Sequence, residues 1–178
     1  MQQLSSGPDS QLATPTPATM SAWHAFLTAH AVVVRVLERE LMESQQLPLA
    51  EYDVLVQLSE AEAGRLRMAQ LADMVLLSRS GLTRLVERLE SDGLVRREVC
   101  PSDARGAYAV LTGQGRERLQ EATARHRQSI QAHFAGALDC AQVNALRDAL
   151  GQIVAANVDD RGSSARGCGS PAIVEQED

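Results

Sequence analysis

The chain has 178 residues and a formal net charge of −6; 44% of its residues are hydrophobic and only 3% are aromatic. This length fits one domain with a sizeable core, which leucine, valine and alanine must fill. No run approaches the roughly 18 apolar residues of a membrane span, and the N-terminus lacks the pattern of a secretory signal. We therefore expect a cytoplasmic protein without a membrane segment.

Both terminal segments are predicted to lack a stable fold. Residues 1–19 are rich in serine, proline, threonine and glutamine, which cannot bury a core, and we expect them to be disordered. Residues 159–178 mix glycine, serine and acidic residues, as in a flexible tail. The folded part is therefore expected to span residues 20–158.

Two helices are expected in the first third of the chain. Apolar residues recur at helical spacing over residues 20–44, namely Met20, Trp23, Leu27, Val34, Leu37 and Leu41. A second helix is predicted from about residue 48 to 60, because Pro48 is a residue type that helices accept at their first turn.

Residues 64–112 carry the most informative pattern. A short helix pattern is followed by a polar turn and then by a longer amphipathic helix, about 79–93. At 100° per residue its two faces separate cleanly. One arc holds Leu82, Leu85, Val86 and Leu89, and the opposite arc holds Arg79, Ser80, Thr83, Arg84, Glu87 and Arg88. Ser78 is a suitable N-cap, and Gly93 is a residue type expected just beyond a helix end.

Two short strands are predicted after this helix, at 94–99 and 107–111. Pro101, Ser102, Asp103 and Gly106 between them are turn formers, so Arg105 is expected at or near the tip of a hairpin. Asp103 is placed to brace its guanidinium or to cap the turn. Helix, turn, helix and hairpin in this order indicate a winged helix-turn-helix, which offers a helix to the major groove of DNA and an arginine to the minor groove.

The charge distribution is compatible with DNA as a partner. Residues 65–105 hold eight arginines and six acidic residues, a net charge of +2, whereas the rest of the chain carries −8. The positive segment coincides with the winged unit, and acidic surfaces elsewhere would orient the protein and limit non-specific binding.

Two further helices are expected after the hairpin. The first follows Thr112 or Gly113 and runs to about residue 136, and the second runs from about 139 to 158. Both carry apolar residues along one side. A monomer would leave such a seam exposed, and two copies related by a two-fold axis could cover it. Helix spacing alone also permits a monomer in which these helices extend the core.

From about Trp23 to Val158 the chain resembles the MarR family of bacterial transcriptional regulators. The matching pieces are PLAEYDVLVQL, LADMVLLSRSGLTRLVERLESDGLVRR, the Asp103-x-Arg105 turn and LTGQGRERL at 111–119. The resemblance implies a mainly α fold with a small β-hairpin wing. A winged helix-turn-helix at 45–112 would be flanked by dimerisation helices at 20–44 and 113–158.

The resemblance also implies a function. Family members bind palindromic sites in double-stranded DNA as homodimers, and many are repressors released by a small phenolic or aromatic acid. Carried over residue by residue, the DNA-binding positions are Ser78, Arg79, Ser80, Thr83, Arg84 and Arg88 on the helix and Asp103 and Arg105 on the wing.

An effector would bind between the dimer helices and the winged unit. Trp23, Phe26, His30 and Tyr52 are the candidate lining residues, and Arg35 or Arg39 could pair with a carboxylate. Aromatic residues on an apolar face are equally expected in a core.

Other function classes have less support. The chain has no nucleophile elbow, phosphate loop or zinc-protease motif, so we expect neither an enzyme nor a cofactor. Its odd number of cysteines, Cys100, Cys140 and Cys168, argues against structural disulfides. Cys100 lies beside Arg96, Arg97 and Arg105, which could favour a thiolate that senses oxidants. Winged helices also serve as protein-interaction modules that do not read DNA, and this alternative stays open.

Overall fold

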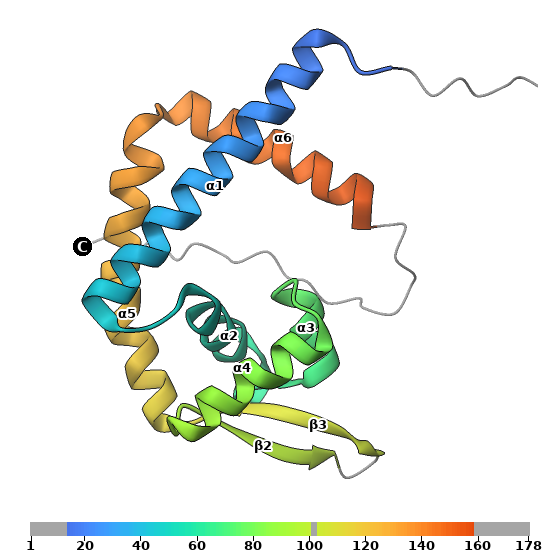
Figure 1. Ribbon diagram of the computed structural model, residues 1–178, viewed down its shortest axis with the longest axis vertical. Coiled ribbons are helices and arrows are strands. Elements are labelled where there is room, and N and C mark those ends of the chain that lie inside the picture. Colours follow the sequence, from blue (N-terminus) through green and yellow to red (C-terminus); the bar gives the residue numbers. More distant parts are fainter. Residues whose placement is uncertain (1–13, 101–102, 159–178) are drawn as a thin grey trace, which may run out of the picture. The chain divides into compact units, whose positions relative to one another are not determined.

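The computed structural model describes residues 14–100 and 103–158, except for the side chains of Cys100 and residues 103–105 (Figure 1). The chain divides after Phe134 into two compact units. The first unit contains the winged helix-turn-helix together with α1 and α5. The second contains a 3-10 turn, Ala135–Ala137, and helix α6, Cys140–Val158.

Helix α1 spans Pro17–Gln45 and begins earlier than predicted. Thr16 is its N-cap, because its hydroxyl accepts a hydrogen bond from the Thr19 backbone N–H at 3.1 Å, and Pro17 occupies the first turn, where no backbone donor is needed. Residues 17–19 are therefore helical, which corrects the prediction that the disordered tail extends to residue 19. Residues 1–13 and 159–178 of the two predicted tails lie outside the described part.

The helix-turn-helix follows in the expected order. Helix α2 spans Leu49–Glu60, α3 spans Met68–Met74 and α4 spans Arg79–Ser91. A short 3-10 turn, Glu62–Gly64, leads into a strand that the sequence did not predict, β1 at Arg65–Arg67. In the turn between α3 and α4, Leu76 adopts a left-handed conformation with φ +54° and is 88% exposed.

The sheet has three antiparallel strands in the order β1-β3-β2, instead of the predicted two-stranded hairpin. Strand β2 spans Val95–Cys100, and β3 spans Asp103–Leu111. Their pairing continues to Cys100 opposite Asp103, with an irregularity after Val99, so the turn is shorter than the predicted 101–106. Arg105 consequently lies within β3, near its hairpin end.

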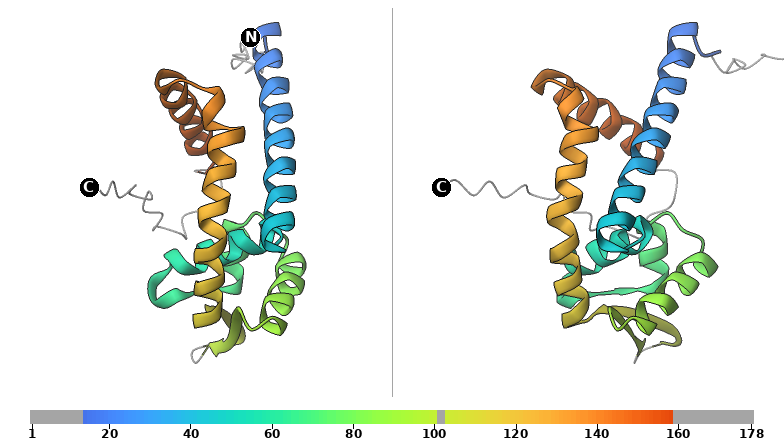
Figure 2. Two further views of the ribbon diagram at one scale, coloured as in Figure 1. Left: turned by 90° about the vertical axis from the view of Figure 1, so that its left-hand side faces the viewer. Right: turned by 60° about the vertical axis from the view of Figure 1, so that its left-hand side comes forward.

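Helix α5, Gly113–His133, is joined to the sheet through its N-cap. The Thr112 hydroxyl donates to the carbonyl oxygens of Gly93, at 2.7 Å, and Leu94, at 3.0 Å, and accepts from the Gly115 N–H at 2.9 Å. Helices α1 and α5 lie side by side (Figure 2). Of the two residues predicted to precede the helix, Thr112 and Gly113, Thr112 is the N-cap, and the helix ends about one turn earlier than expected.

One hydrophobic cluster holds the first unit together. It joins the inner faces of α2, α3, α4 and the sheet to the C-terminal end of α1 and the first half of α5. Its fully buried members include Leu41, Val54, Leu55, Leu58, Leu71, Leu82, Val86, Leu89, Val95 and Ala109. The predicted fold class, mainly α with a small β wing, is confirmed.

Candidate nucleic-acid interface

Helix α4 presents a polar face to solvent, as its sequence predicts. Leu82, Leu85, Val86 and Leu89 are all buried, and burial of these side chains fixes which face remains outside. Ser78 is the N-cap, and its hydroxyl accepts from the Gly81 N–H at 3.1 Å. Ser78, Arg79, Ser80, Arg84, Glu87 and Arg88 are exposed, and Thr83 is partly exposed.

The acidic side chains of α4 form ion pairs with an arginine of the wing strand β2. Arg97 of β2 lies 3.7 Å from Glu87, and its Nε donates to Glu90 at 2.8 Å. Its backbone N–H also donates to Glu90, at 3.2 Å. These hydrogen bonds lower the pKa of Glu90. Arg97 therefore offsets part of the negative charge of Glu87 and Glu90 and holds β2 against α4.

Two arginines of the polar face of α4 are available to bind a negatively charged partner. Within the described part of the chain, Arg79 and Arg84 have no acidic partner. A guanidinium without an acidic partner can bind a phosphate or the O6 and N7 atoms of guanine through two donors. The exposed side of α4 is thus positively charged at its first two turns.

Arg88 differs from the other predicted contacts, because it has a partner inside the protein. Its Nε donates to the Glu51 carboxylate of α2 at 3.0 Å. The Glu51 side chain is only 8% exposed, while that of Arg88 is 57% exposed. The sequence did not indicate this pair, since 37 residues separate its members.

On the wing, the backbones of Asp103 and Arg105 belong to β3, but their side chains, like that of Cys100, lie outside the described part. A cluster that sequence reasoning missed lies further along the sheet. The guanidiniums of Arg65 and Arg67 on β1 lie 5.1 and 5.7 Å from the ring centre of Tyr108 on β3. Alternation over three residues is too short a signal to predict such a strand.

Comparison with known proteins identifies the fold. A MarR family model matches residues 45–106. The crystal structure of AbsC, a MarR family transcriptional regulator from Streptomyces coelicolor, is 34% identical, with a TM-score of 0.73 over 81% of this chain and 97% of that one. The chain belongs to the MarR family.

Two further relatives agree with this assignment. Sco3205, a MarR family transcriptional regulator from the same organism solved in complex with DNA, is 33% identical, with a TM-score of 0.75 over 83% of this chain and 91% of that one. An uncharacterized HTH-type transcriptional regulator of Bacillus subtilis, YkoM, is 33% identical over 73 residues, which is 41% of this chain and only 47% of that protein. This MarR-family chain is a DNA-binding transcriptional regulator and not an enzyme.

The structure separates the four predicted ligand residues of this MarR-family regulator. Trp23, Phe26 and His30 follow one another on the exposed part of α1, with ring centres 6.0 and 6.3 Å apart. Tyr52 is buried in α2 and packs on His126 of α5, with ring centres 4.6 Å apart. No described contact joins Tyr52 to the other three. The proposed carboxylate partners Arg35 and Arg39 are exposed on α1.

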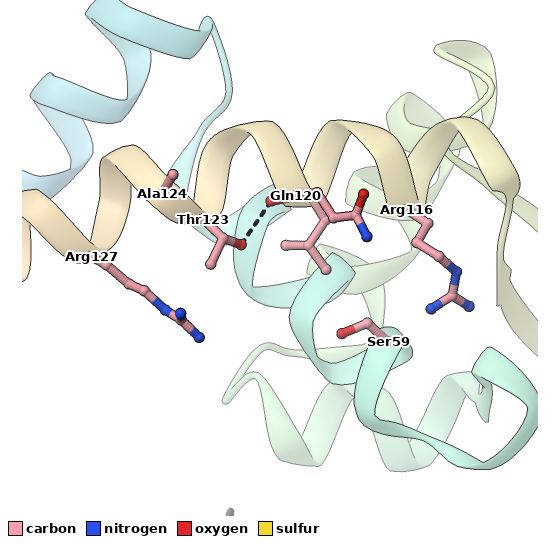
Figure 3. Close-up of a pocket in the computed structure, with 7 residues that line it drawn as sticks. Ser59, Arg116, Gln120, Thr123, Ala124 and Arg127 are labelled. Atoms are coloured by element: carbon pink, nitrogen blue, oxygen red, sulfur yellow. Dashed lines mark hydrogen bonds between the residues drawn. The ribbon is translucent and has the colours of Figure 1, made fainter. Parts of the chain in front are cut away.

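A different hollow lies between α2 and α5 (Figure 3). It has a volume of about 400 Å³ and is lined by Ser59, Arg116, Leu119, Gln120, Thr123, Ala124 and Arg127. Neither Arg116 nor Arg127 has an acidic partner within the described residues. The Ser59 and Thr123 hydroxyls already donate to the backbone carbonyls of Val56 and Leu119. The donors that have no partner among the described residues are therefore the two guanidiniums and the amide of Gln120.

His126 gives the α2–α5 contact a dependence on pH. Burial lowers its pKa below the ordinary 6.5, and its Nδ1 has no hydrogen-bond partner in the described part. As pH falls below about 6.5, the unfolded chain takes up a proton that the folded protein resists. We expect stability to decrease from pH 6.5 to 5.0 with a slope of at most about 1.4 kcal/mol per pH unit from this group.

Denaturant unfolding at pH 7.5, 6.5, 5.5 and 5.0 measures this slope. His126→Phe keeps an aromatic ring against Tyr52 and should flatten the curve, while His24→Phe, an exposed control on α1, should not. An equal slope in the wild type and in His126→Phe would contradict the assignment.

Proposed function

We propose that this regulator binds a palindromic operator as a cytoplasmic homodimer and represses transcription, with α4 in the major groove and the wing arginine, Arg105, in the minor groove. The observation that carries the proposal is the outward face of α4, where Arg79 and Arg84 have no acidic partner among the described residues while Arg97 pairs with Glu87 and Glu90 of the same helix. The relative Sco3205, whose DNA complex was solved, is similar over 83% of this chain.

Each predicted contact has a distinct role in this proposal. Arg79 and Arg84 contact phosphates or guanine edges, and Ser78, Ser80 and Thr83 supply short hydroxyls at the start of the helix, where backbone N–H groups also favour phosphate. Asp103 orients Arg105, which a narrow minor groove attracts through its negative potential. The exposed polar face of α4 favours DNA over a protein partner, because a protein-docking surface would be more apolar.

The homodimer explains the unusual surface of α1. Its apolar stripe runs along the whole helix, but only the C-terminal part, with Leu37 and Leu41, is buried. Nearer the N-terminus, Trp23 is 50% exposed, Phe26 43% and Leu27 42%. Contrary to the sequence expectation, one 18-residue window of α1 is apolar enough to cross a membrane, with a mean hydropathy of 1.3. Because the protein is a DNA-binding regulator, we infer that this apolar surface is buried against α1 of a second copy and not in a membrane.

A small aromatic acid is proposed as the effector. The hollow between α2 and α5 offers two guanidiniums for an anionic group beside the apolar side chains of Leu119 and Ala124. The exposed rings of Trp23, Phe26 and His30 remain the alternative site, completed by a second subunit. A ligand in either place contacts helices that carry the winged unit and could shift its orientation.

Fluorescence anisotropy on DNA from upstream of the regulator's own gene, against scrambled DNA of equal length, tests the proposal. We expect saturable binding that prefers the native DNA and weakens steeply with salt, because phosphate contacts release counterions. Arg84→Ala should lower the affinity for the native DNA about 10- to 100-fold, and Arg105→Ala should weaken binding while the fold and the dimer persist. Hydroxybenzoic acids added to the complex test the effector.

Glu43→Gln, an exposed change on α1, serves as the control. Unchanged affinity in Arg84→Ala would contradict the placement of α4 in the major groove. Unchanged affinity in Arg105→Ala would contradict the placement of the wing in the minor groove. Equal, weak binding to both DNAs and to other upstream regions would favour a protein-interaction module.

A further inference from the structure

We propose that Glu51 is a positioning residue for DNA reading, which holds the recognition helix α4 through Arg88. The inference rests on the proposed function and changes the role of one predicted DNA contact. Arg88 orients α4 by binding a group within the protein. Base recognition is then carried out by the first two turns of the helix.

The burial of Glu51 is the first argument. Its side chain is 8% exposed, and Arg88 Nε, at 3.0 Å, is its hydrogen-bond partner among the described residues. A buried carboxylate is costly unless it is paired, so the folded protein needs a cation at this point. Arg88 supplies it from α4.

The geometry of Arg88 is the second argument. While Nε donates to Glu51, Nη1 lies 3.5 Å from the carbonyl oxygen of Arg84, one turn earlier on the same helix. Both contacts draw the guanidinium back toward the protein. The side chain is still 57% exposed, but its orientation is set by groups that belong to α2 and α4.

The attachment of Glu51 to the fold is the third argument. Glu51 is in the first turn of α2, and the next residue, Tyr52, is buried against His126 of α5 and lies 3.4 Å from the Thr123 hydroxyl. One turn of helix thus contacts α5 through one side chain and α4 through the neighbouring one. Since side chains that read bases must be held within about 0.5 Å and 10–20° of their productive geometry, a fixed anchor behind α4 determines how well they discriminate.

Glu51→Gln separates the two roles of Arg88, because the amide keeps the shape of the carboxylate and leaves Arg88 free to reach DNA. If Glu51 is a positioning residue, the Glu51→Gln substitution should lower the ratio of native-DNA to scrambled-DNA affinity about 10-fold. Arg88→Ala should give the same loss, and the double variant no more than either single one. Glu43→Gln removes an equal charge from the surface of α1, where Glu43 pairs with Arg39, and should leave the ratio unchanged.

If Arg88 reads DNA directly, Glu51→Gln will leave the ratio unchanged or raise it, while Arg88→Ala lowers it, and this result would overturn the inference. Hydrogen exchange of DNA-free protein gives a second readout, independent of any operator. The inference requires faster exchange in Glu51→Gln within residues 84–91 than in the rest of the first unit. Uniformly faster or unchanged exchange would reject it, whereas absence of any DNA preference in the wild type would reject only the proposed function.

Discussion

Gly115→Ala should destabilise the protein by about 3 kcal/mol or prevent its folding, the largest single-residue effect that we expect on stability. A Cβ atom at this position would overlap the carbonyl oxygen of Leu94 and lie 2.8 Å from Leu111 Cδ1. The obstacle is backbone, which cannot rotate away as a long side chain can. Relief requires α5 to move away from Leu94, which would also break the hydrogen bonds from the Thr112 hydroxyl to the carbonyl oxygens of Gly93 and Leu94.

Gly113→Ala is the matched control, because it is in the same first turn of α5 but a Cβ there meets nothing within 4 Å. Urea unfolding at one fixed protein concentration compares the variants, since the stability of a dimer depends on concentration. We expect Gly113→Ala to be neutral or slightly stabilising. Equal stability of the two variants would contradict the close contact between α5 and the sheet.

Leu27→Glu should convert the proposed dimer to monomer and abolish high-affinity DNA binding. In a two-fold interface each substitution occurs twice, so loss of two buried leucines and burial of two carboxylates should weaken association by about 3–5 kcal/mol, at least 100-fold. Sedimentation velocity over a concentration series measures the dissociation constant, and anisotropy on native DNA measures the consequence for binding.

Ala29→Glu adds the same charge two residues away, on the opposite face of α1, and is exposed in the structure. We expect it to remain a dimer. If Leu27→Glu also stays dimeric, the apolar stripe of α1 is not the interface, and another surface must bring two winged units to a palindromic site.

The sequence predicted those elements whose signals are local. Four leucine and valine residues at helical spacing identified the buried face of α4, and Ser78 identified its N-cap. These predictions succeeded because spacing and cap chemistry depend on residues only three or four positions apart.

The parts that the sequence did not predict depend on contacts between distant residues. Strand β1 has three residues and exists because β3 pairs with it. The Glu51–Arg88 pair, and the clash that excludes a side chain at Gly115, involve groups that only the fold brings together. Grouping Tyr52 with Trp23, Phe26 and His30 rested on residue type, which does not distinguish a buried aromatic ring from an exposed one.

Helix α1 has one further consequence. Its 29 residues contain no glycine and no proline after the first turn, so it extends roughly 44 Å as a rod without a joint. One end is fixed in the winged unit, and the other carries the apolar surface that we assign to a partner. Such a rod behaves as a lever: a small tilt where the two subunits meet becomes a larger displacement of the DNA-reading end. In the proposed dimer this angle would set the distance between two bound half-sites, and a ligand that changed the angle slightly would release the DNA without unfolding either subunit.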